Sequence, residues 1–173
     1  NLFKKNFFSF FSVFFIITSA QALSLQKTPV ILDAPWGMTW LDENHLLITQ
    51  KSGEIFMVNT QDYSQTPIKH NIPSVQYGQG GMLDIISEEN NVWVTCSIEK
   101  DGKHTTAIYH TELSGDTLVN EKKIYEALPY IKSPYHFGSR LEIKEDYLYA
   151  SIGERGEGMI AQDPTNSIGA IIR

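Results

Sequence analysis

The hexapeptide GMLDII at residues 81–86 is one of three similar strand-like segments, together with GMTWL at 37–41 and GSRLEI at 138–143. Each begins with a glycine, and each is followed by a polar turn and a second apolar run. The second runs are HLLITQ at 45–50, VWVTCSIE at 92–99 and YLYASIG at 147–153. Short apolar runs separated by such turns predict antiparallel β-strands.

The leading glycines Gly37, Gly81 and Gly138 are spaced 44 and 57 residues apart. Propeller blades repeat every 40 to 50 residues or so, whereas a β-sandwich does not require the same segment to head each unit. We therefore predict an all-β fold, a β-propeller of four-stranded antiparallel blades. The longer second interval predicts additional residues between Leu118 and Pro134.

The chain ends with the apolar run GAIIR at residues 169–173. A propeller ring has to close, so we expect residues 23–173 to form the N-terminal part of a larger propeller. This part would contain about two and a half blades, given the usual repeat length.

Residues 1–22 have the three-part pattern of a secretory signal peptide. Lys4 and Lys5 precede an apolar segment at 7–17, and Ala20-Gln21-Ala22 forms a cleavage site. The apolar segment is too short to span a bilayer comfortably. We predict cleavage after Ala22, export to the periplasm or the medium, and no stable membrane anchor.

The formal net charge is −6, and both charged residues within 1–22 are lysines, so the exported part is more acidic still. This charge argues against a nucleic-acid partner, which favours a basic surface. Cys96 is the single cysteine, which excludes a disulfide within these residues. Its apolar neighbours predict a thiol buried in a strand.

Polar side chains near the glycine-led strands mark a candidate ligand site. Aligning the three glycines gives Pro35, Gln79 and His136 equivalent positions, so repeat geometry would direct all three toward one end of the central channel. Two structural alternatives stay open at this point. His136 could be a hydrogen-bonded histidine at a blade junction, and Gln79 could serve a tight glycine turn.

Four motifs, in order, resemble those of the glucose/sorbosone dehydrogenases, the soluble aldose sugar dehydrogenases that use pyrroloquinoline quinone (PQQ). They are APWGMTWL at 34–41, YGQGGMLDI at 77–85, YHFGSRLEI at 135–143 and SIGERGEGMIAQDPTNSIGAIIR at 151–173. The resemblance implies a six-bladed propeller with PQQ and calcium as cofactors and an aldose as small-molecule substrate. The electron acceptor stays unknown.

The resemblance also implies roles for individual residues. His136 corresponds to the general base that takes the proton of the sugar C1 hydroxyl, and Glu154 corresponds to the carboxylate that orients it. Gln79 corresponds to a glutamine of the sugar and quinone pocket. Arg140 and Arg155 lie in the same motifs and would bind PQQ carboxylates or pair with acidic neighbours. The calcium ligands and the main PQQ contacts are expected outside these residues.

Some positions depart from the family pattern, and two other function classes remain alternatives. Tyr135 stands where glucose-specific members have an acidic residue, which favours a broader aldose substrate. Glu154 replaces a shorter aspartate. A metal-dependent propeller lactonase would use carboxylates such as Asp84 as metal ligands. A non-catalytic binding propeller is the third possibility, since one fold can serve many functions.

Overall fold

The computed structural model describes residues 23–173, so the predicted signal peptide at 1–22 lies outside the described residues. The described chain forms three antiparallel sheets, here called blades 1, 2 and 3. Blade 1 contains β1 (Pro35–Trp40), β2 (His45–Gln50), β3 (Ile55–Asn59) and β4 (Gln65–Ile68). Blade 2 contains β5 (Met82–Glu88), β6 (Asn91–Lys100), β7 (Lys103–Ser114) and β8 (Thr117–Glu126). Blade 3 contains β9 (Gly138–Lys144), β10 (Tyr147–Ile152) and β11 (Ile171–Ile172).

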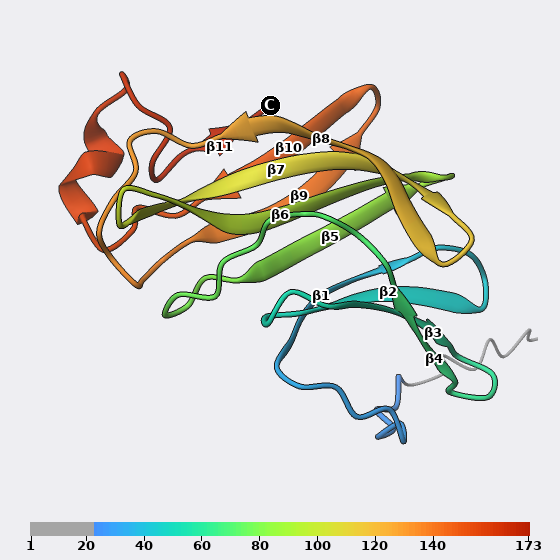
Figure 1. The fold of residues 1–173 in the computed structure, drawn as a ribbon. Helices are drawn as coiled ribbons and strands as arrows, with labels where there is room; N and C mark the ends of the chain where they lie inside the picture. The colour runs from blue at the N-terminus through green and yellow to red at the C-terminus, as the bar shows by residue number, and fades with distance from the viewer. Residues whose placement is uncertain (1–22) are drawn as a thin grey trace, which may run out of the picture.

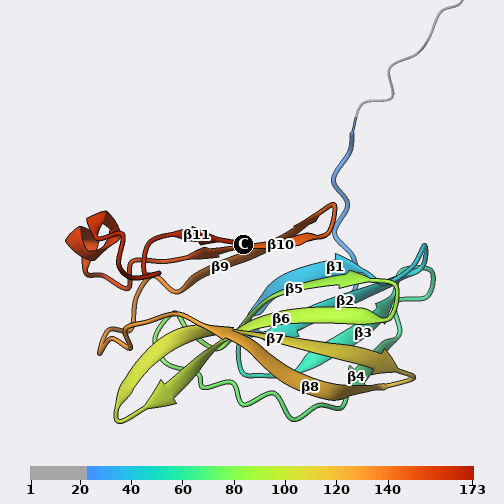
Figure 2. The ribbon, with the colours of Figure 1, turned by 90° about the horizontal axis from the view of Figure 1, so that it is seen from above.

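The first strands of the blades lie next to one another. Strand β1 contacts β5, and β5 contacts β9, while the later strands of each blade extend outward (Figures 1 and 2). This is the arrangement of a β-propeller, in which inner strands surround a common axis. It confirms the predicted fold class, and the three described blades form an open part of a ring.

Apolar side chains fill the space between neighbouring blades. One cluster packs blade 1 against blade 2 and includes Leu47, Ile55, Ile85 and Val94. A smaller cluster, around Ile108, Leu141 and Ala150, packs blade 2 against blade 3. Burial of these side chains is the main stabilising contribution to the contacts between blades. The single cysteine, Cys96, is buried in the first cluster, as predicted.

Each inner strand contains an irregularity in register near its beginning. The register shifts between Pro35 and Met38 in β1, between Met82 and Ile85 in β5, and between residues 138 and 141 of β9. In all three cases, three steps on the inner strand match two on the neighbouring strand, which is the geometry of a β-bulge. The repeated bulge gives the structural alignment of the blades.

This alignment corrects the equivalence predicted from the glycines. Gly37 is the third residue of β1, whereas Gly81 precedes β5 and Gly138 begins β9. Pro35 begins β1 and corresponds to Met82 and Gly138 rather than to Gln79 and His136. Gln79 and His136 lie in the loops before β5 and β9, three and two residues before these positions. The glycines differ in position because each satisfies a different local requirement rather than a repeated one.

The length of blade 2 also differs from expectation. Strands β6 and β7 have 10 and 12 residues, against 6 and 5 in β2 and β3. Strand β8 also has 10 residues against 4 in β4, so the additional residues lie partly before Leu118 and partly between Leu118 and Pro134, where they were predicted. In the part of the chain that the structure describes, no helix is long and apolar enough to cross a membrane.

Candidate active site

Three loops meet where the inner strands of blades 2 and 3 begin. The loop before β5 contacts the loop before β9, because the Gln79 N–H donates to the carbonyl of Pro134 at 2.7 Å. The loop after β10 contacts the same segment through the Gly153 N–H, which donates to Phe137 O at 3.1 Å. These backbone hydrogen bonds hold the residues predicted as a site at one end of the inner strands.

His136 is the point where these loops converge. Its backbone N–H donates to Gln79 Oε1 at 2.8 Å, and its ring Nδ1 is hydrogen-bonded to Glu154 Oε1. The histidine side chain is 53% exposed and that of Glu154 is 29% exposed. A carboxylate that accepts from Nδ1–H selects the tautomer with a free lone pair on Nε2. Nε2 can therefore accept a proton.

The backbone at His136 has a φ of 51°, in the left-handed region. Histidine is one of the few non-glycine residues enriched there, and functional sites often contain such strained positions. Close backbone packing surrounds it, since a Cβ added at Gly153 would collide with the carbonyl of His136. Glycine at position 153 is thus required for the two loops to approach each other.

The electrostatic environment keeps Glu154 ionised. The hydrogen bond with His136 is the largest cause that lowers the pKa of this carboxyl, and the N–H of Gly156 adds to the effect. The carboxylate is then available to stabilise a positive charge on the imidazole, as in the histidine–aspartate part of a catalytic triad. The structure therefore brings His136, Glu154 and Gln79 together, as the sequence predicted.

Arg155 occupies a different environment from the one predicted. Its side chain is fully buried, and its guanidinium donates to the carbonyls of Ser133, Tyr135 and His104. It lies behind the loop of His136 rather than at the exposed side of the site. This position argues against the predicted contact with PQQ and indicates a role in ordering the loop.

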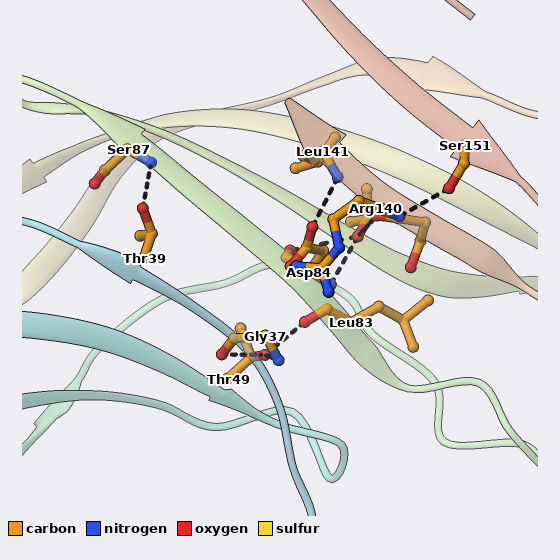
Figure 3. A network of polar contacts seen from close by, with 11 residues as sticks. Gly37, Thr39, Thr49, Leu83, Asp84, Ser87, Arg140, Leu141 and Ser151 are labelled. Atoms are coloured by element: carbon orange, nitrogen blue, oxygen red, sulfur yellow. Dashed lines mark hydrogen bonds and ion pairs between the residues drawn. The ribbon is translucent and has the colours of Figure 1, made fainter. Parts of the chain in front are cut away.

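Arg140 lies further along β9 and is 75% exposed. The buried carboxylate of Asp84 accepts from Arg140 Nη1 at 3.3 Å and from the Leu141 N–H at 2.7 Å (Figure 3). Trp36 and Ser151 complete a cavity of about 200 Å³ beside these residues. Both Asp84 oxygens therefore have protein partners, which argues against the metal-ligand role that a lactonase would require of this residue.

Hydroxyl groups connect the blades beside the Asp84–Arg140 pair, and the sequence analysis did not predict these contacts. Thr49 Oγ1 accepts from the Gly37 N–H and donates to the carbonyl of Leu83 in the next blade (Figure 3). Thr95 in blade 2 repeats the pattern, accepting from Asp84 N–H and donating to Ser139 O. The second strand of each blade carries a serine or threonine at the corresponding position. This recurrence in the sequence could have revealed the contacts between blades.

The donors at this site suit an anionic quinone better than a metal ion. PQQ is flat and carries carboxylates. The exposed groups are the Gln79 amide and the His136 imidazole in the loops and, beside Asp84, the Arg140 guanidinium. Within residues 23–173, by contrast, no group of three or more His, Cys, Asp and Glu side chains could hold a metal ion. These donors are of a kind that can bind the carboxylates of PQQ.

Comparisons with known proteins agree with this fold. The sequence profile of the Glucose / Sorbosone dehydrogenase family matches residues 32–173. An uncharacterized protein of Synechocystis sp. is 28% identical over 183 aligned residues, which cover 91% of this chain and 44% of that protein. The chain thus spans less than half the length of this curated relative.

Solved structures of sugar dehydrogenases are also similar. The soluble aldose sugar dehydrogenase of Escherichia coli, in its apo form, is 28% identical with a TM-score of 0.76, over 82% of this chain and 44% of that protein. The PQQ-bound aldose sugar dehydrogenase of Streptomyces coelicolor is 23% identical with a TM-score of 0.71, over 86% and 46%, and supports the fold alone. Because the family profile covers most of the chain and the structural relatives share its blades, the chain belongs to the glucose/sorbosone dehydrogenase family.

Proposed function

We propose that this protein oxidises the anomeric hydroxyl of aldose sugars to lactones, with PQQ as cofactor and His136 as general base. The observation that carries the proposal is the exposed imidazole of His136, held through Nδ1 by Glu154 and tied to Gln79, in a chain of this family. We further propose that the protein is exported and acts in the periplasm or outside the cell.

The residues of this chain would act mainly on the proton of the substrate. His136 Nε2 accepts the proton of the C1 hydroxyl, and Glu154 stabilises the imidazolium that forms. The bound quinone supplies an acceptor for the hydride that leaves C1, so the sugar loses two electrons and two hydrogens and becomes a lactone.

Gln79 and Arg140 would bind rather than react. Gln79 Oε1 is occupied by the His136 N–H, which leaves the amide NH₂ to donate to an oxygen of the sugar or the quinone. Arg140 would meet an anionic group, since its guanidinium is exposed and Asp84 fixes one edge of it. Calcium is proposed on family resemblance only.

The test is reconstitution of the complete gene product with PQQ and calcium, followed by reduction of an artificial electron acceptor in the presence of a panel of aldoses. We expect reduction that depends on both PQQ and sugar. The E. coli aldose sugar dehydrogenase, assayed in parallel, is the positive control. The proposal fails if that control is active and this protein reduces the acceptor with no aldose.

A further inference from the structure

Arg155 is a buried cation without an acidic partner. Its side chain is 0% exposed, and no carboxylate of residues 23–173 lies within ion-pair distance of it. Burial lowers the pKa of the guanidinium to about 10, so the group still carries its charge at neutral pH. Burying a charge costs free energy unless hydrogen bonds compensate it, so the hydrogen bonds of this side chain have to offset that cost.

Its contacts concentrate on the residues beside His136. Nε donates to Tyr135 O at 3.0 Å, Nη2 donates to Ser133 O, and Cζ lies 3.5 Å from the centre of the Phe137 ring. The backbone N–H of Arg155 donates to the carbonyl of His136 itself at 3.2 Å. Arg155 therefore contacts the loop on both sides of the proposed base, His136.

Two further features connect Arg155 to blade 2 and to Glu154. Nη1 donates to His104 O at 2.6 Å, which ties the loop to the beginning of β7 in blade 2. Arg155 also follows Glu154 directly, and its own φ is 61°. A shift of the guanidinium would therefore move both the imidazole and the carboxylate that orients it.

We propose that Arg155 is a positioning residue that holds His136 in register with Glu154 and the reacting hydroxyl, an inference that rests on the proposed function. The planar guanidinium donates in several fixed directions while one face stacks on an aromatic ring. A lysine carries the same charge on a flexible stem but cannot reproduce this fork. Arg155 acts through the loop and does not touch the sugar or the quinone.

The decisive variant is Arg155→Lys in the complete, PQQ-loaded protein. Because misplacement of a reacting group by about 1 Å costs around a hundredfold in rate, we expect kcat to fall 10- to 100-fold with KM within about twofold. Arg173→Lys is the matched control, since Arg173 also stacks on a ring, that of Tyr147, and has no contact with the site. It should leave kcat unchanged.

A second measurement does not depend on activity. Histidine labelled with ¹⁵N, assigned with His136→Asn, should show a single Nδ1–H tautomer for His136 in the parent protein and a mixture of tautomers in Arg155→Lys. If Arg155→Lys does not fold, Phe137→Leu removes the ring under the guanidinium and should shift the tautomer and kcat in the same direction.

The outcomes separate the two proposals. A tautomer change in a protein that oxidises no aldose would retain the positioning role and reject the proposed function. An active protein in which Arg155→Lys keeps both the parent kcat and the single tautomer would overturn the positioning role. Equal losses in Arg155→Lys and Arg173→Lys would also overturn it.

Discussion

At the scale of single residues, the pairing of His136 with Glu154 sets the chemistry of the site. The carboxylate fixes which ring nitrogen is free, and about half of the histidine side chain is exposed. The sequence indicated this pair through family resemblance alone. Their contact depends on how closely the loops approach at Gly153, which motifs do not reveal.

Glu154→Gln should lower kcat about a hundredfold with little change in KM, because an amide does not stabilise the imidazolium by charge. Glu157→Gln, an exposed neighbour, is the control. Because the pKa of Glu154 is lowered from 4.5, its stabilising interaction is fully present above that value and is lost as pH falls through the lower folded-state pKa. Steady-state kinetics from pH 5 to 8 should therefore give the same ratio of parent kcat to Glu154→Gln kcat at each pH. A ratio of kcat values near one would contradict the role of Glu154.

His104 should make folding stability depend on pH. Burial lowers its pKa from 6.5, the charge of Arg155 adds to this effect and that of Glu99 opposes it, and its Nδ1 is buried without a partner in the described chain. The unfolded chain then binds the proton first, so stability is fully present above pH 6.5 and declines as pH falls below it.

The variant His104→Phe tests this, because it retains the ring stacked at 3.9 Å on Tyr77. Urea unfolding at pH 8 and pH 5.5 should show a smaller loss of stability on acidification in the variant than in the parent. The same loss in both proteins would exclude His104 as its source.

At the scale of elements, the approach between inner strands determines where glycine is needed. A Cβ at Gly37 would lie 2.8 Å from Asp84 Cα and 2.9 Å from Leu83 O, so blade 1 could not approach blade 2 as closely. Gly37→Ala should cost about 1–3 kcal/mol of unfolding free energy through overpacking. Gly158→Ala is the control, because nothing lies within 4 Å of its added Cβ. Equal stabilities in denaturant would contradict this packing.

The bridging hydroxyl of Thr95 is the second element-scale test. Thr95→Val keeps the shape but leaves the Asp84 N–H and the Ser139 carbonyl without this partner. Burying unsatisfied groups costs about 1–3 kcal/mol, which chemical denaturation would measure. Thr60→Val, at an exposed turn, should cost much less. A neutral Thr95→Val would show that this hydroxyl does not join blades 2 and 3.

The strands were predictable where apolar alternation and turns coincide, as in β2, β6 and β10. The outer strand β4 was missed because it contains Pro67 and polar side chains, a composition typical of edge strands. The alignment of the glycines failed for a different reason. Gly37 allows close packing against Asp84, whereas Gly138 adopts a φ of 72°, so similar residues meet unrelated needs.

At the scale of the whole molecule, the site lies at one end of the inner strands, where loops of blades 2 and 3 meet. The proposed base comes from the loop before β9, its carboxylate from the loop after β10, and Gln79 from the loop before β5. A substrate at this end of the channel could reach all three. The function proposed here therefore depends on the contact between two blades rather than on any one motif.

The absorbance of PQQ bound to the complete protein, recorded by stopped flow after an aldose is added, tests whether His136 is the base of an aldose dehydrogenase. We predict that the parent protein reduces the bound quinone. His136→Ala should bind PQQ but reduce it at least about a hundredfold more slowly, because it lacks the base. Reduction by the variant at the parent rate would contradict the role of His136 as base, and bound quinone that no aldose reduces would contradict the proposed aldose oxidation.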